Sequence, residues 1–301
     1  KWEAGRALAK DVLISMISGR EAPTTAYLDA VAAMLRDDSL DPAFRALALS
    51  LPSEDDLAQS IYDAGHSPDP VAIHAARTEM AKQIATALRP TLAPLYEQMA
   101  VSGAYSPDAK AAGKRSLRAA ALGLLTHIDG PDRARAQFAA AGNMTESLSA
   151  LSILLAHDTA DAELAAFENR WSADPLVLDK WFMLQVTQCP PSLAVETTKA
   201  LTEHKDFDWQ NPNRFRSVLG AFTTNAAGFH DPSGAGYELL ADWLIKLDPL
   251  NPQTTARLSG AFETWKRYDA DRQALIATQL NRILATPNLS RDTTEMVSRI
   301  R

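Results

Sequence analysis

The sequence predicts an all-α protein: an α-solenoid of stacked antiparallel helix pairs, a HEAT/armadillo-like superhelix, forming a single helical-repeat domain over residues 1–301. Apolar residues recur at helical spacing between short breaks that carry Gly or Pro, and no alternating β-branched run bounded by turns is present. Hydrophobic residues make up 46% of the chain, and many are Ala and Leu, which are strong helix formers. A helix start is also repeated at a spacing typical of helical repeats. An irregular helical bundle is the alternative architecture.

The expected elements follow one another with breaks of only a few residues. Helical periodicity and punctuation predict helices over residues 2–18, 24–37, 41–50, 54–64, 69–101, 107–128, 131–141, 145–157, 160–172, 175–187, 191–204, 211–224, 234–247, 252–267, 270–285 and 290–300. Pro90 and Pro94 interrupt one of these patterns and predict a kink or break there. Gly220 and Gly260 are expected where helices approach closely, since Gly otherwise costs about 1 kcal/mol inside a helix.

The repeated helix start lies in the last third of the chain. Asn211-Pro212 and Asn251-Pro252 each open a segment that reads N-P, seven residues, then G-A-F. Asn caps a helix by accepting a backbone N–H of the first turn, and Pro fits the first helical position, which needs no N–H donor. The helices at 211–224 and 252–267 are therefore expected at equivalent places in successive repeats.

Charge and cysteine content exclude several functions. The net charge of −7 and the pI near 5.4 argue against nucleic-acid and anionic-membrane partners, and no apolar run is long enough to span a membrane. Cys189 is the single cysteine, so no intrachain disulfide can form, which favours a reducing, cytoplasmic location. The chain begins at Lys1 in a helical pattern without a signal peptide, and we expect other residues to precede it in the natural protein.

The sequence carries no catalytic constellation of its own. The six histidines include no pair at the i, i+4 spacing of H-E-x-x-H and no cluster with cysteine, so we expect no metal or cofactor in this chain. Cys189 has no neighbouring base and is interpreted as a structural thiol. The isolated chain is therefore not expected to be an enzyme.

Three arginines are candidate binding residues. Arg214 and Arg216 follow the first Asn-Pro start, and Arg257 follows the second. A cation is disfavoured near a helix N-terminus, so each arginine is either solvated or serves an anion such as a carboxylate or phosphate. Both interpretations stay open from the sequence alone, because single exposed charges cost little.

Several stretches together resemble one known family. They read Asn143-Met-Thr-Glu-Ser-Leu-Ser-Ala-Leu, Asp179-Lys-Trp-Phe-Met-Leu-Gln185, Asn211-Pro-Asn-Arg-Phe-Arg-Ser217, Gly220-Ala-Phe222 and Trp265-Lys-Arg-Tyr-Asp-Ala-Asp-Arg-Gln273. The chain is similar to the C-terminal domain of bacterial aminopeptidase N, a zinc metallopeptidase of the alanyl aminopeptidase type. The resemblance covers essentially all residues, and the combination of N-P-N-R-x-R with K-R-Y-D-x-x-R-Q makes it specific.

The resemblance implies a larger parent enzyme whose catalytic domain binds zinc through H-E-x-x-H and a downstream Glu. None of those motifs occurs in this chain. The family's C-terminal domain is a HEAT-like superhelix that covers the catalytic domain, limits peptide access and places basic side chains in an internal cavity. The matching positions are Arg216 and Arg257. The implied partners are the catalytic domain of the same polypeptide and peptide substrates.

The alternative from another class is a free-standing helical-repeat scaffold that binds a protein partner on its concave face. An H-E-x-x-H motif upstream in the gene would decide between the two interpretations.

Overall fold

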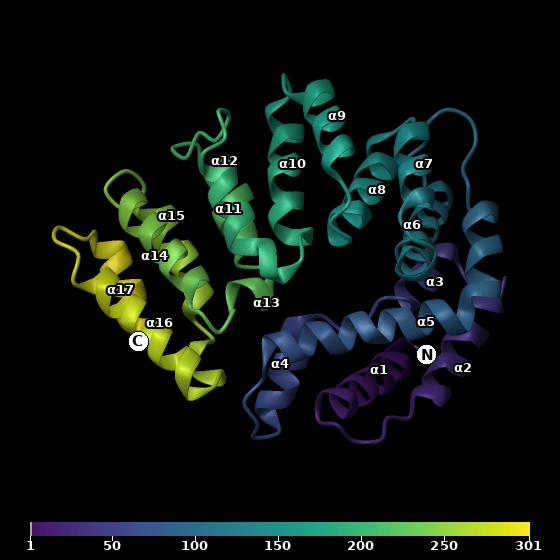
Figure 1. The fold of residues 1–301 in the computed structure, drawn as a ribbon, viewed down its shortest axis with the longest axis horizontal. Helices are drawn as coiled ribbons and strands as arrows, with labels where there is room; N and C mark the ends of the chain where they lie inside the picture. Colours follow the sequence, from purple (N-terminus) through teal and green to yellow (C-terminus); the bar gives the residue numbers. More distant parts are fainter. Residues whose placement is uncertain (1) are drawn as a thin grey trace. The chain divides into compact units, whose positions relative to one another are not determined.

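The computed structural model describes residues 2–301, and the regular secondary structure of this part of the chain is all helical, with no β-strand (Figure 1). None of the helices described is long and apolar enough to cross a bilayer. The chain groups into two compact units. The first contains residues 1–57 and 72–164, and the second contains residues 58–71 and 165–301.

The first unit is a run of helices joined by short turns. Its helices are α1 (Trp2–Ile17), α2 (Thr24–Arg36), α3 (Pro42–Ala48), most of α5 (Pro70–Gln98), α6 (Ala109–Asp129), α7 (Asp132–Ala140) and α8 (Met144–Ala156), together with the first turns of α4 (Glu54–Asp63) and α9 (Asp161–Trp171). Neighbours in sequence pack on one another, as α1 does on α2 and α7 on α8, and α3 packs on α6. This is the behaviour expected of antiparallel pairs with short connections.

Helix α5 is continuous through both of its prolines, so the break that was one of the two expectations at Pro90 and Pro94 does not occur, whereas the kink remains a prediction. The two prolines lie one turn apart and are exposed, whereas Leu88, Leu92 and Leu95 on the other face are buried. Each proline removes one helical N–H donor, but the carbonyl released on the exposed face can bond to water. The buried leucines then hold the helix in register.

The second unit repeats the pairing more regularly. Its helices are α10 (Pro175–Gln188), α11 (Ala194–Thr202), α12 (Pro212–Phe215), α13 (Ala226–Phe229), α14 (Ala235–Leu247), α15 (Pro252–Ser259), α16 (Ala270–Leu284) and α17 (Arg291–Ile300), with the ends of α4 and α9. Helix α14 packs on α15, and α16 packs on α17 (Figure 1). Successive pairs contact each other through α14 with α16 and through α15 with α17. These contacts form two rows of helices, as in a helical repeat.

Both Asn-Pro helix starts are confirmed. The side chain of Asn211 accepts the backbone N–H groups of Asn213 and Arg214, and that of Asn251 accepts the N–H of Thr254. Both helices end earlier than expected. Helix α12 passes into a π-helical turn over Arg216–Gly220, and α15 passes into a 3-10 turn over Gly260–Phe262.

The close approaches expected at Gly220 and Gly260 are not found. A Cβ added at Gly260 would meet no atom within 4 Å, and one added at Gly220 would meet only ordinary van der Waals neighbours. The crowded glycines are Gly228 and Gly236. An added Cβ would lie 2.9 Å from the carbonyl oxygen of Pro191 at Gly228, and 3.1 Å from the carbonyl carbon of Phe229 at Gly236.

The K-R-Y-D-A-D-R-Q motif builds a buried hydrogen-bond network in the second unit. The ring nitrogens of His230 bond to the hydroxyls of Tyr237, at 2.9 Å, and Tyr268, at 3.0 Å. Arg267 donates to the Tyr268 hydroxyl at 2.9 Å, and Arg272 donates to the His230 carbonyl at 2.7 Å. The motif therefore serves the fold, because it joins the end of α13 to the starts of α14 and α16.

Candidate anion-binding groove

An open groove of about 480 Å³ lies in the second unit between the π-helical turn and α15. Its lining residues are Arg216, Gly220, Gln253, Thr254, Arg257 and Leu258. The two arginines expected to act together therefore line one surface, contributed by the two Asn-Pro segments. No acidic residue lines this groove in the part of the chain described.

Local structure positions Arg216. Asn211 caps the short helix that leads to it, and the π-helical turn starts at Arg216 itself. One Nη atom of Arg216 donates to the side-chain oxygen of Asn213 at 2.6 Å. This contact is to a neutral amide, so the positive charge of the guanidinium is not neutralised. The residue is exposed, so its remaining donors can reach a ligand.

Arg257 enters the groove from α15. Asn251 caps this helix, and Thr255 and Ser259 are buried on its inner face while Arg257 is exposed on the outer one. Neither Arg257 nor Arg216 forms an ion pair with a carboxylate within residues 2–301. Two arginines with exposed charge on one acid-free surface make a site that can bind an anion by charge-assisted hydrogen bonds.

Arg214 does not line this groove. The expectation that its side chain faces a cavity is therefore wrong. Its side chain is buried, and its Nε donates to the Asp179 carboxylate at 2.6 Å. Its guanidinium also donates to the backbone carbonyl of Asp206 and lies 4.7 Å from the centre of the Phe182 ring. A buried cation needs such partners, because burying an unpaired charge is costly. Arg214 therefore anchors α12 to α10.

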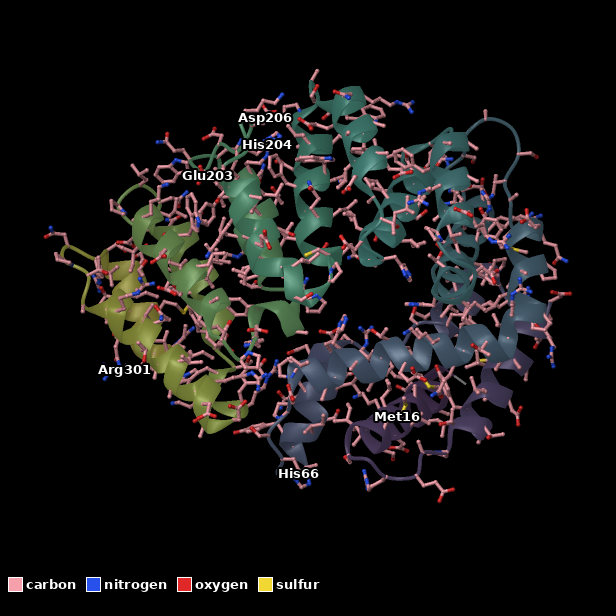
Figure 2. The ribbon with its side chains drawn as sticks, in the orientation of Figure 1. Met16, His66, Glu203, His204, Asp206 and Arg301 are labelled. Atoms are coloured by element: carbon pink, nitrogen blue, oxygen red, sulfur yellow. The ribbon has the colours of Figure 1, made fainter. Side chains whose placement is uncertain are left out.

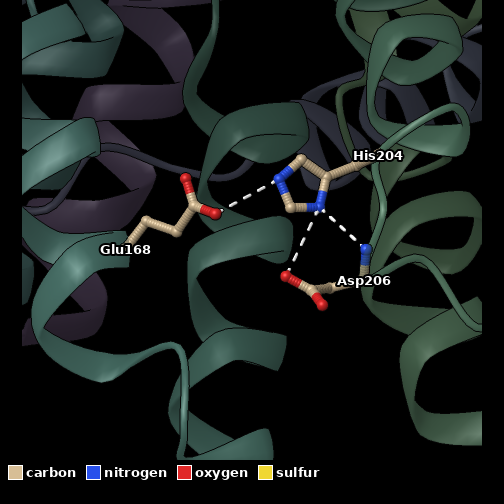
Figure 3. Close-up of side chains that lie close together, drawn as sticks. All are labelled: Glu168, His204 and Asp206. Atoms are coloured by element: carbon tan, nitrogen blue, oxygen red, sulfur yellow. Dashed lines mark hydrogen bonds and ion pairs between the residues drawn. The ribbon is translucent and has the colours of Figure 1, made fainter.

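A second polar cluster lies at the turn after α11, where Figure 2 labels His204 and Asp206. Glu168 approaches Nε2 of His204 at 3.3 Å, while the backbone N–H of Asp206 donates to Nδ1 at 3.2 Å (Figure 3). The two carboxylates thus lie at opposite nitrogens of one imidazole. The Lys205 ammonium is within 4 Å of both carboxylates. These contacts make a hydrogen-bonded connection between α9 and the 203–206 turn. One ligand atom each from Glu168, His204 and Asp206 lies within 4.8 Å of the other two, which is close enough for a metal site, but both carboxylates are already paired with the Lys205 ammonium.

Comparison with known proteins decides the family. The model of the domain family DUF3458_C, a domain of unknown function described as ARM repeats, matches residues 1–301. The chain belongs to this family. The DUF3458_C match confirms the all-α helical-repeat architecture expected from the sequence.

Curated relatives of this DUF3458_C chain carry the name aminopeptidase N. The protein of Caulobacter vibrioides is 42% identical over 307 residues, and that of Escherichia coli K12 is 37% identical over 311 residues. Each alignment covers 99% of this chain and 35% of the relative. The structure of Legionella pneumophila aminopeptidase A in complex with aspartic acid matches with a TM-score of 0.89 and 29% identity, covering 99% of this chain and 36% of that one. The resemblance to the C-terminal domain of bacterial aminopeptidase N is confirmed.

Some groove residues of the DUF3458_C domain were missed by sequence reasoning. Gln253 and Thr254 line the groove at the start of α15, and Asn213 holds the Arg216 side chain. A signal for Asn213 was available, because a residue three positions before Arg216 on a helix lies on the same face. Gln253 and Thr254 carried no comparable signal, since polar residues are common in the first turn of any helix.

Proposed function

We propose that this chain is the non-catalytic C-terminal domain of a zinc-dependent aminopeptidase, and that its Arg216–Arg257 groove binds the carboxylate end of a peptide substrate. The parent would remove N-terminal residues from peptides. The domain would cap the catalytic part of the same polypeptide, limit access to it and hold the far end of the peptide.

One observation carries the proposal: Arg216 and Arg257 line a single groove without a carboxylate among its lining residues. A charge-assisted hydrogen bond is worth about 1.5–3 kcal/mol when well formed, and less where water and salt screen the charge. An acid-free groove leaves this interaction available to a ligand. The π-helical turn at Arg216 gives further support, because such turns are frequent at functional sites.

Zinc chemistry is assigned to the rest of the parent. The chain spans 35% of the length of the curated relatives, and its sequence lacks the H-E-x-x-H motif through which the catalytic domain of the family binds zinc. The zinc would be held by residues outside this chain, where it would supply activation of water and polarisation of the scissile carbonyl. A cytoplasmic location is part of the same proposal.

The test is kinetic and uses the full-length enzyme. Arg216→Ala and Arg257→Ala should each raise KM by several-fold to about tenfold for short peptides with a free C-terminal carboxylate. The same variants should change KM little for the matching C-terminal amides and for single-residue chromogenic amides, which lack the charge. The effect should weaken as salt is added, because both side chains are exposed.

Arg299→Ala is the matched control, because Arg299 is an exposed arginine of α17 outside the groove. It should leave KM for acids and amides unchanged. Arg214→Ala should instead lower the melting temperature, since it leaves Asp179 without its partner. If the Arg216 and Arg257 variants raise KM equally for peptide acids and for peptide amides, the proposed binding of the carboxylate is contradicted. An aminopeptidase parent would be contradicted by a full-length gene without H-E-x-x-H upstream, which would favour the free-standing scaffold.

A further inference from the structure

We propose that a pocket in the first unit binds a small neutral ring compound that carries a hydrogen-bond acceptor, and that Tyr27 is the donor. The pocket measures about 330 Å³ and is enclosed by α1, α2 and the segment from the end of α3 to the start of α4. Small-molecule sites in proteins begin at roughly this size. The proposal is independent of the Arg216–Arg257 groove, which lies in the other unit.

The walls of the pocket are largely apolar. They are formed by Gly5, Ala9, Met34, Leu47 and Leu51, with Pro52 beside them. Apolar walls favour a ligand whose body is hydrocarbon, because removing apolar surface from water lowers the free energy. Methionine at one wall suits ligands of varied outline, since its unbranched side chain adapts to irregular shapes.

Tyr27 supplies the buried polar feature of the pocket, and Arg6, Ser50 and Ser53 are the other polar residues that line it. It is only 2% exposed, and its hydroxyl has no hydrogen-bond partner among residues 2–301. Burial raises the pKa of Tyr27 to about 12, so the hydroxyl is a neutral donor at every physiological pH. The hydroxyl is not among the fully buried polar atoms that lack a partner, so it is reached from the pocket and can donate to a ligand there. A ligand with one acceptor oxygen would satisfy it.

Charged groups at the mouth are already engaged. Arg6 and Lys10 both form ion pairs with Asp56 at 2.6 Å, and the Ser53 hydroxyl accepts the backbone N–H of Asp56. The two cations share one carboxylate, so the mouth keeps a net positive charge and disfavours a cationic ligand. The apolar walls and the neutral Tyr27 hydroxyl favour a neutral ligand over an anion.

The first experiment compares two probes on the full-length enzyme. Acetophenone has a ring and one carbonyl acceptor, and ethylbenzene has nearly the same shape without the acceptor. Binding is followed by the ¹³C-methyl NMR signal of Met34, which lines the pocket. Acetophenone should shift this signal with a Kd on the order of 1 mM, a value usual for so small a ligand. Tyr27→Phe should raise the Kd of acetophenone about fivefold and leave the Kd of ethylbenzene unchanged.

The second experiment fills the pocket without disturbing the fold. A Cβ added at Gly5 would meet only the Met34 methyl, at 3.9 Å, so Gly5→Leu directs its side chain into space that is open. The change also favours α1, because Leu is a better helix former than Gly. Gly5→Leu should keep or raise the melting temperature and abolish the response to both probes. The proposal is overturned if 10 mM acetophenone leaves the Met34 signal unmoved, if Tyr27→Phe does not discriminate between the probes, or if Gly5→Leu still binds.

Discussion

His230 is a neutral base held among arginines and tyrosines. Burial, assisted by Arg267 and Arg272, lowers its pKa to about 3. In the unfolded chain the pKa returns to about 6.5. Below pH 6.5 the unfolded state therefore binds a proton that the folded state binds only near pH 3. The contribution of His230 to the free energy of unfolding is complete above pH 6.5 and declines as the pH falls.

The first prediction follows from this shift. At pH 5 the linkage at His230 should remove about 2 kcal/mol of stability compared with pH 8. Urea unfolding of wild type and His230→Gln at the two pH values measures it, because the stability difference between the two proteins should shrink by that amount at pH 5. The pKa of His127 and that of His157 are also lowered by burial, but both residues are present in both proteins and their effects cancel. Parallel pH profiles would contradict the prediction.

Arg214 and Arg216 show what residue-level reasoning could and could not supply. The Asn-Pro pattern predicted both arginines near a helix start, and spacing alone gave no reason to separate them. They differ because the partner of Arg214 is Asp179, thirty-five residues away on α10. Such a long-range ion pair leaves no mark in local sequence. The motif that contains Asp179 and the motif that contains Arg214 each supply one partner of this ion pair.

Helix positions were predicted well, because Gly, Pro and apolar periodicity act locally. Most helices begin and end within two residues of the expected positions. The largest differences are in the segments after Asn211 and Asn251, where continuous helices were expected and π-helical and 3-10 turns occur. Helix α5 also ends three residues early, and α11 begins three residues late. Helix α13 was missed because it has only four residues and is placed by Asn225, whose amide donates to the backbone carbonyls of Val186 and Cys189. Those contacts join residues that are 39 and 36 positions apart, so the local sequence does not predict them.

The second prediction contrasts two glycines in helical elements. Gly228→Ala should destabilise the protein by about 1–3 kcal/mol, because its methyl group would press against Ala194 and the Pro191 carbonyl. Gly260→Ala should be neutral or stabilising by up to about 1 kcal/mol, because Gly260 has helical backbone angles and open space around it. Thermal unfolding of the two variants tests the pair. A reversed order of melting temperatures would be incompatible with the packing described.

At the scale of the molecule, exposed apolar side chains point to a missing partner. Leu176 is 68% exposed and Met183 is 40% exposed, and they lie seven residues apart on one face of α10. Single exposed apolar residues are common, but two on one helix face favour a covered surface. A larger apolar patch on the chain remains a prediction from the expectation that it packs on a catalytic domain. The single-domain expectation for residues 1–301 is likewise still a prediction.

The third prediction concerns this face of α10. The chain expressed without the rest of its polypeptide should self-associate with rising concentration in sedimentation velocity runs. The double variant Leu176→Lys, Met183→Lys should stay monomeric at the same concentrations, because it replaces apolar contact area with two repelling charges. Ser298 is an exposed residue of α17 and lies outside α10, so Ser298→Lys serves as a control for added charge. Association that is equal in all three proteins would remove α10 as the contact face.

The discontinuous second unit has a consequence for synthesis on the ribosome. Residues 58–71 belong with residues 165–301, and they are joined to that part by Ser67 with the Arg267 carbonyl and by Arg272 with Asp69, contacts that span 200 and 203 residues. At translation rates of about 5–20 residues per second, the 58–71 segment waits roughly 10–40 s for these partners to be made. The rest of the first unit, residues 72–164, leaves the ribosome during that interval. Its folding can therefore run ahead, while the 58–71 segment is the part of the nascent chain exposed longest to chaperones and proteases.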